Sequence, residues 1–166
     1  MARAHGGVAT YLGLEATDPQ QRSVRAEYER ADRALKLFDE ARMLARQAQE
    51  TGAKELADET ERHAWRIVRE ADPVRLSYVA AVLDLTDQTV RDWLDADLLE
   101  DFGGSPRRVG LEGVARVREL VRDLRNSGRQ RDLMTAVLRE LERDELRRDE
   151  RFLTSLQQMR RGERAS

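Results

Sequence analysis

The stretch LSYVAAVLDLTDQTVRDWLDADLLEDFGGSPRRVGLEGVARVRELV, residues 76–121, determines the fold predicted for this chain. Ser77 is a suitable helix N-cap, because its hydroxyl can accept a hydrogen bond from an unpaired amide of the first turn. A short apolar helix follows it. Thr86 is a second candidate cap, and the helix after it has an apolar face at Val90, Trp93 and Leu94. Two short helices joined by a tight turn predict a helix-turn-helix.

The residues after the second helix have the pattern of a small β-hairpin. Leu98-Leu99 is the expected first strand, residues 102–106 form the tip, and residues 107–109 form the returning strand. Gly110 then leads into a further helix with a regular apolar face. The order of these elements predicts a winged helix-turn-helix.

This stretch resembles the winged helix-turn-helix of the MerR superfamily, including its small excisionase-like and BldC-like members. The resemblance covers residues 76–124, less than a third of the chain. The family usually has a glycine before the Leu-Leu pair, where this chain has Asp97. The matching positions are Ser77, Val79, Ala80 and Leu83 in the first helix, Thr86, Thr89, Val90, Arg91 and Trp93 in the second, Leu98-Leu99, and Arg107-Arg108 in the wing.

The resemblance implies a way of binding double-stranded DNA. The second helix would enter the major groove, and the wing would contact the backbone or the minor groove. The DNA-binding residues would then be Gln88, Thr89 and Arg91 for bases or nearby phosphates, Arg107 and Arg108 in the wing, and Ser77 and Tyr78 for phosphates beside the first helix. Two alternatives stay open, a solvated hairpin for the wing arginines and an ion pair of Arg91 with Asp87 or Asp95.

The charge of the chain is unevenly distributed. Residues 1–104 hold 14 basic and 21 acidic residues (net −7), whereas residues 105–166 hold 16 and 11 (net +5). A phosphate-binding surface is therefore expected at the wing and after it. The predicted recognition helix itself carries Asp87, Asp92 and Asp95, which repel phosphates.

The composition also excludes several classes of protein. The 166 residues include no cysteine, which rules out a disulfide framework or a thiolate metal site. No apolar run approaches the roughly 20 residues needed to span a bilayer. The N-terminus lacks the basic-then-apolar order of a signal peptide. We therefore expect a cytoplasmic protein that has no membrane partner.

Nothing in the sequence predicts an enzyme or a cofactor. Gly103-Gly104 is not followed by the Gly-Lys-Ser/Thr of a phosphate-binding loop. The two histidines, His5 and His63, are far apart, so neither a zinc site nor a nucleophile–base pair is expected. The many carboxylates alternate with arginines at helical spacing, which is typical of a solvated surface.

The flanks of the winged region are expected to be helical. We predict a mainly α protein, with the central winged helix-turn-helix and its hairpin wing flanked by long N-terminal helices and a C-terminal helix. The predicted divisions are a flexible N-terminus (1–18), a helical dimerisation region (19–72), the winged domain (73–126), and a C-terminal helix and tail (127–166). Within 19–72 the pattern predicts helices over 19–50 and from Lys54 to before Pro73. The expected apolar face of the first helix is Val24, Tyr28, Ala31, Leu35, Phe38, Ala41 and Ala45, and that of the second is Leu56, Thr60, Ala64, Ile67 and Ala71. A homodimer built largely on Tyr28, Leu35, Phe38 and Ile67 is expected, because a single stripe needs a partner.

The leading hypothesis is a dimeric, sequence-specific DNA-binding regulator of transcription. An alternative is an antitoxin that represses its own operon and binds a toxin through an apolar patch in its tail, at Phe152, Leu153, Leu156 and Met159. A third hypothesis is a helical scaffold whose helix-turn-helix makes only protein contacts. The acidic recognition helix is the main argument for the scaffold.

Overall fold

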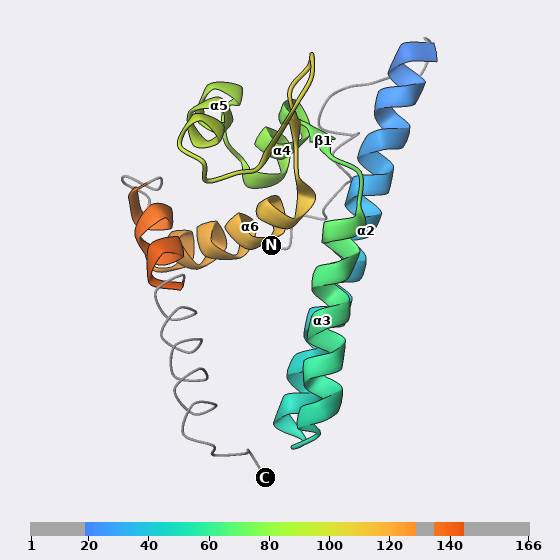
Figure 1. The fold of residues 1–166 in the computed structure, drawn as a ribbon, viewed down its shortest axis with the longest axis vertical. Helices are drawn as coiled ribbons and strands as arrows, with labels where there is room; N and C mark the ends of the chain where they lie inside the picture. Colours follow the sequence, from blue (N-terminus) through green and yellow to red (C-terminus); the bar gives the residue numbers. More distant parts are fainter. Residues whose placement is uncertain (1–18, 129–134, 145–166) are drawn as a thin grey trace, which may run out of the picture. The chain divides into compact units, whose positions relative to one another are not determined.

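The computed structural model describes residues 19–128 and 135–144. The predicted flexible N-terminus (1–18) and the partner-binding patch at 152–159 lie outside these residues. The described chain is mainly helical, with a small three-stranded antiparallel sheet between helices (Figure 1). The predicted fold class is therefore confirmed.

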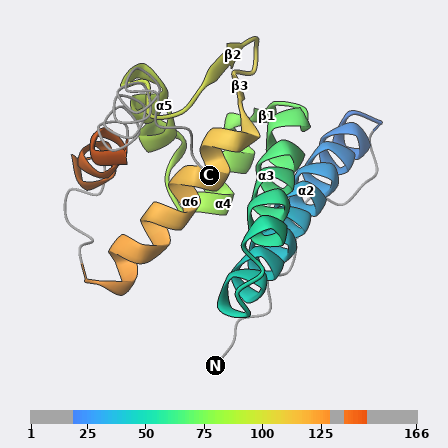
Figure 2. The same cartoon turned by 60° about the horizontal axis from the view of Figure 1, so that its bottom comes forward.

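The first two helices of the described residues form an antiparallel hairpin, and they lie side by side in both views (Figures 1 and 2). Helix α2 spans Pro19–Glu50 and helix α3 spans Lys54–Glu70. Gly52 has φ +81°, a conformation that glycine adopts without steric cost, and it makes the turn between them. The predicted face of α2 is confirmed, because its members are buried except for the half-buried Val24: Tyr28, Ala31, Leu35, Phe38, Ala41 and Ala45.

Two predictions about this hairpin are wrong. Tyr28, Leu35 and Phe38 are buried within the single chain, with at most 4% of their surface exposed, so they are not available to a second copy. In α3 the predicted buried face included Leu56, which is 57% exposed, whereas Ala57 is buried in its place. Alanine contributes little to a hydrophobic pattern, so the larger Leu56 shifted the predicted face by one residue.

The winged region begins with a strand that the sequence pattern did not predict. Strand β1 (Val74–Arg75) pairs antiparallel with β3 (Arg108–Val109), which also pairs with β2 (Asp101–Gly103). The predicted first strand of the wing, Leu98-Leu99, is wrong. Both leucines are buried residues that precede β2, and the strand itself starts three residues later.

Three helices complete this region: α4 (Leu76–Leu83), α5 (Asp87–Asp95) and α6 (Leu111–Asn126). Thr86 caps α5 as predicted, since its side chain accepts a hydrogen bond from the Thr89 amide. Ser77 is not a cap, because α4 already begins at Leu76 and the cap position is Arg75. Val90, Trp93 and Leu94 are buried, which fixes the orientation of α5.

The contacts divide the chain into two compact units, with the boundary after Arg118. The described residues 19–118 belong to the first unit, so the predicted boundary between 72 and 73 does not separate two compact bodies. The second unit contains the end of α6 and a helical segment over residues 135–144. No helix in the described part of the chain combines the length and apolarity required to cross a membrane.

Candidate nucleic-acid interface

Helix α5 presents a polar face to solvent. Gln88 is exposed and donates a hydrogen bond to Asp92, with 2.9 Å between Nε2 and Oδ1. The half-buried Thr89 shares a hydrogen bond with Thr86, with 2.8 Å between the hydroxyl oxygens. Arg91 is exposed, and within the described residues it makes no ion pair, contrary to the alternative that paired it on its own helix. The helix therefore offers one amide and one unneutralised guanidinium to a ligand.

Arg107 in the wing is held by two carboxylates. Its guanidinium lies 2.6 Å from an Asp101 oxygen and 3.2 Å from an Asp95 oxygen. The backbone amide of Gly103, followed by Arg107, lowers the pKa of Asp101. Asp101 and then Asp95 raise the pKa of Arg107 in turn. This arrangement links the C-terminal end of α5 to the wing. It differs from both environments expected for Arg107 from the sequence, which were a DNA contact and a solvated hairpin.

Arg108, the second wing arginine, points to the helical hairpin. It donates to Glu27 of α2, which also accepts hydrogen bonds from the backbone amide and the side chain of Arg75 at 3.1 and 3.2 Å. Burial alone would raise the pKa of Glu27, but hydrogen bonds from Arg108 and Arg75 outweigh it, so that the pKa is lowered. Arg108 is therefore chiefly a structural residue.

Ser77 and Tyr78 also have structural roles in place of the expected phosphate contacts. Tyr78 is fully buried and donates a hydrogen bond to Asp32 of α2 over 2.8 Å. The Ser77 hydroxyl shares a hydrogen bond with the Tyr28 hydroxyl over 2.7 Å. The rings of Tyr28 and Tyr78 lie 5.2 Å apart between centroids. This tyrosine pair fastens α4 to α2, so the prediction of Tyr78 as a DNA-binding residue is wrong for this conformation.

Strand β2 contains an aromatic residue, Phe102, that the sequence pattern assigned to the tip of the hairpin. Phe102 is 55% exposed, and the glycines that follow it have φ values of +71° and +92°. A Cβ atom on Gly110 would lie 2.8 Å from the Phe102 ring, so the ring packs closely over the backbone there. In the sequence, the available signal for this contact was a phenylalanine in the predicted hairpin followed eight residues later by a glycine, which leaves room for an aromatic ring.

Comparison with known proteins assigns the chain to no family. No family model, no curated protein and no solved structure matches the chain.

The electrostatic character of the candidate interface is mixed. Residues 84–109, which contain α5 and the wing, hold seven acidic and three basic residues. Two of the three basic side chains are engaged by carboxylates, which leaves Arg91 as the accessible cation. Among residues 19–128 and 135–144, no group of His, Asp and Glu side chains is arranged to hold a metal ion. The interface can donate hydrogen bonds at Gln88 and Arg91, but its general attraction for phosphates is weak.

Proposed function

We propose that this protein is a sequence-specific, double-stranded-DNA-binding regulator of transcription that acts as a homodimer. The orientation of α5 is the observation that supports this best. Its apolar face is buried, its polar face with Gln88 and Arg91 is exposed, and the wing adjoins its C-terminal end. A helix placed in this way can enter the major groove, where glutamine reads adenine and arginine reads guanine through paired hydrogen bonds.

The acidic surroundings of α5 determine the kind of binding that we propose. Asp87, Asp92 and Asp95 repel the phosphate backbone, so binding to random DNA is weak and base contacts supply a large share of the affinity. Arg107 reaches a phosphate only after its pairs with Asp95 and Asp101 open. We therefore propose that the protein binds DNA with high sequence selectivity, and that its affinity for DNA depends only weakly on salt concentration.

A selection experiment with the full-length protein tests this proposal. Duplexes with a randomised segment are selected on the immobilised protein, and binding of the enriched duplex is measured by fluorescence anisotropy over a series of salt concentrations. Gln88→Ala and Arg91→Ala should each lower the affinity for the enriched duplex by about 1–3 kcal/mol and relax selectivity at one position. Ala81→Ser, at an exposed position of α4, is the control and should have no effect. If no duplex is enriched, the proposal fails.

The pairing of the wing arginines favours a second candidate function. Because Arg107 and Arg108 are both neutralised within the chain, the winged surface can bind a protein partner instead of DNA, as a helical scaffold would. If the selected duplexes bind no better than random duplexes, and both bind negligibly, the scaffold function is favoured. The DNA-binding activity would also serve an antitoxin that binds a toxin through residues 152–159, which lie outside the described residues.

A further inference from the structure

One face of the helical hairpin exposes large apolar side chains. Leu37 and Leu44 on α2 are 47% and 55% exposed, and Leu56 on α3 is 57% exposed. The first residues of α6 contact the other side of the hairpin, where Arg118 pairs with Asp39 and Arg116 lies over the Trp65 ring. Two helical residues two positions apart are separated by about 200° around the axis, so Leu37 points away from Asp39. We call the side with Leu37, Leu44 and Leu56 the outer face.

The spacing along the outer face is that of a helix–helix interface. Leu37 and Leu44 are seven residues apart, and Ala34, Ala41 and Ala48 alternate with them at steps of three and four. This is the heptad pattern with which two helices pack side by side. Ala41 and Ala48 are buried beside the leucines, which leaves the leucines as projecting side chains.

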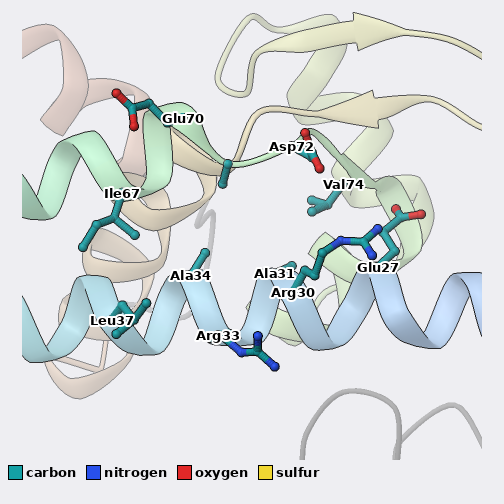
Figure 3. Close-up of a pocket in the computed structure, with 11 residues that line it drawn as sticks. Glu27, Arg30, Ala31, Arg33, Ala34, Leu37, Ile67, Glu70, Asp72 and Val74 are labelled. Atoms are coloured by element: carbon teal, nitrogen blue, oxygen red, sulfur yellow. The ribbon is translucent and has the colours of Figure 1, made fainter.

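The same face carries a groove at the end of the hairpin away from the Gly52 turn (Figure 3). It has a volume of about 320 Å³, and its apolar lining includes Ala31, Ala34, Leu37, Ile67 and Ala71. The contacts Phe38–Trp65 and Arg42–Glu61 set the register of the two helices. In that register Leu44 and Leu56 lie toward the turn. The outer face therefore has projecting leucines at one end and a groove at the other.

The exposed charges of the hairpin also differ between its two ends. The turn end, residues 37–61, exposes six acidic and two basic residues, a net charge of −4. The open end, residues 19–36 and 62–70, exposes eight basic and two acidic residues, a net charge of +6. Two hairpins that associate in an antiparallel orientation bring ends of opposite charge together, whereas a parallel orientation brings ends of like charge together.

We propose that a second copy of this chain covers the outer face, with the two hairpins antiparallel and related by a two-fold axis. This orientation places the leucines of each copy, Leu44 and Leu56, over the apolar groove of the other. It also sets each acidic turn end against a basic open end. A two-fold interface needs a surface that is complementary to itself. In the antiparallel orientation the projecting leucines meet the groove, and the oppositely charged ends of the two hairpins meet each other. Of the residues expected at the interface from the sequence, Tyr28, Leu35 and Phe38 are buried within one chain, whereas the half-buried Ile67 lines this groove.

The first test is the mass of the full-length protein by light scattering at micromolar concentration. The wild type should have twice the 19.1 kDa mass of the chain, and the double variant Leu37→Glu/Leu44→Glu should have the mass of a single chain. Met43→Glu is the matched control, because Met43 is 52% exposed but lies about 100° around the helix from Leu44. It should remain a dimer, and thermal unfolding should show that every variant is folded. A monomeric wild type, or a double variant that stays dimeric, overturns the proposal.

The second test determines the orientation. The chain has no cysteine, so a single introduced cysteine carries a spin label at one known position. Labels at position 40 should be close across the interface, whereas labels at position 22 should be farther apart by about 50 Å, given a rise of 1.5 Å per residue on both copies. Equal separations at the two positions indicate a parallel dimer and contradict the proposal. Neither test includes DNA, so the dimer and the proposed DNA binding can fail independently.

Discussion

Glu27 and Arg108 form an ion pair although 81 residues separate them in the chain. The carboxylate of Glu27, on α2, also accepts hydrogen bonds from Arg75 on β1. Because β1 and β3 are paired strands, this one side chain joins the helical hairpin to the two strands at the base of the wing. The N-terminal hairpin is therefore part of the body that supports the winged region, and it is not an appended domain.

The first prediction concerns the contribution of Glu27 to stability. Glu27→Gln keeps the shape of the side chain but removes the charge shared by two arginines, and the side chain is only 13% exposed. The free energy of unfolding should fall by about 1–3 kcal/mol, as expected for a charged hydrogen bond. Urea denaturation of both proteins measures the difference. Glu29→Gln breaks an exposed pair with Arg25 and should change stability by less than about 0.5 kcal/mol. Equal effects of the two substitutions would contradict the prediction.

A second prediction follows from the lowered pKa of Glu27. The folded state favours the ionised form of the Glu27 carboxyl group. The contribution of this group to folding stability is therefore complete above the ordinary pKa of 4.5, and it is lost as the pH falls through the lower pKa of the folded protein. The difference in melting temperature between the wild type and Glu27→Gln should be constant near neutral pH. It should shrink steadily below about pH 4.5. A difference that is unchanged at low pH would mean that the carboxylate charge is not the cause.

The helical boundaries of this fold were largely predictable because they depend on local signals. The regular apolar spacing in α2, the glycine at position 52 and the Thr86 cap each act within a few residues. The roles of site residues were less predictable, since they depend on distant partners. Ser77 has the chemistry of a cap, but the Tyr28 hydroxyl 49 residues earlier takes its hydrogen bond. Nothing near Arg108 in the sequence indicates Glu27.

The third prediction separates the observed role of Tyr78 from the role implied by the family resemblance. Tyr78→Phe removes the hydrogen bond to Asp32 and leaves that carboxylate with one donor fewer. The free energy of unfolding should fall by about 1–2 kcal/mol. Affinity for an enriched DNA duplex should be unchanged at a temperature where the variant is folded. A loss of DNA affinity with unchanged stability would instead support the phosphate contact.

A fourth prediction concerns the backbone at Asp97. Asp97 has φ +57°, a left-handed conformation that aspartate adopts less readily than glycine. Asp97→Gly should raise the free energy of unfolding by about 0.5 kcal/mol, because relief of strain exceeds the added flexibility of the unfolded chain. The neighbouring Ala96 has φ −93°, and Ala96→Gly should lower stability by about 0.5–1 kcal/mol. If both substitutions destabilise the protein equally, the turn carries no strain at position 97.

The last prediction tests whether the carboxylates around Arg107 restrain DNA binding. The double substitution Asp95→Asn/Asp101→Asn removes two negative charges beside the proposed phosphate path and weakens the hold on the guanidinium. Affinity for an enriched duplex should rise at low salt, because Arg107 is released to contact a phosphate.

The dependence on salt distinguishes this explanation from a general effect of net charge. With Arg107 free to contact a phosphate, the slope of log affinity against log salt should become steeper by about one unit. Glu29→Gln/Glu50→Gln changes the net charge equally, at two exposed positions of α2, and should leave the slope unchanged. Adding Arg107→Ala to the double variant should abolish the gain. If the gain persists without Arg107, the effect comes from removing acidic charge alone, and the wing does not contact the backbone through this residue.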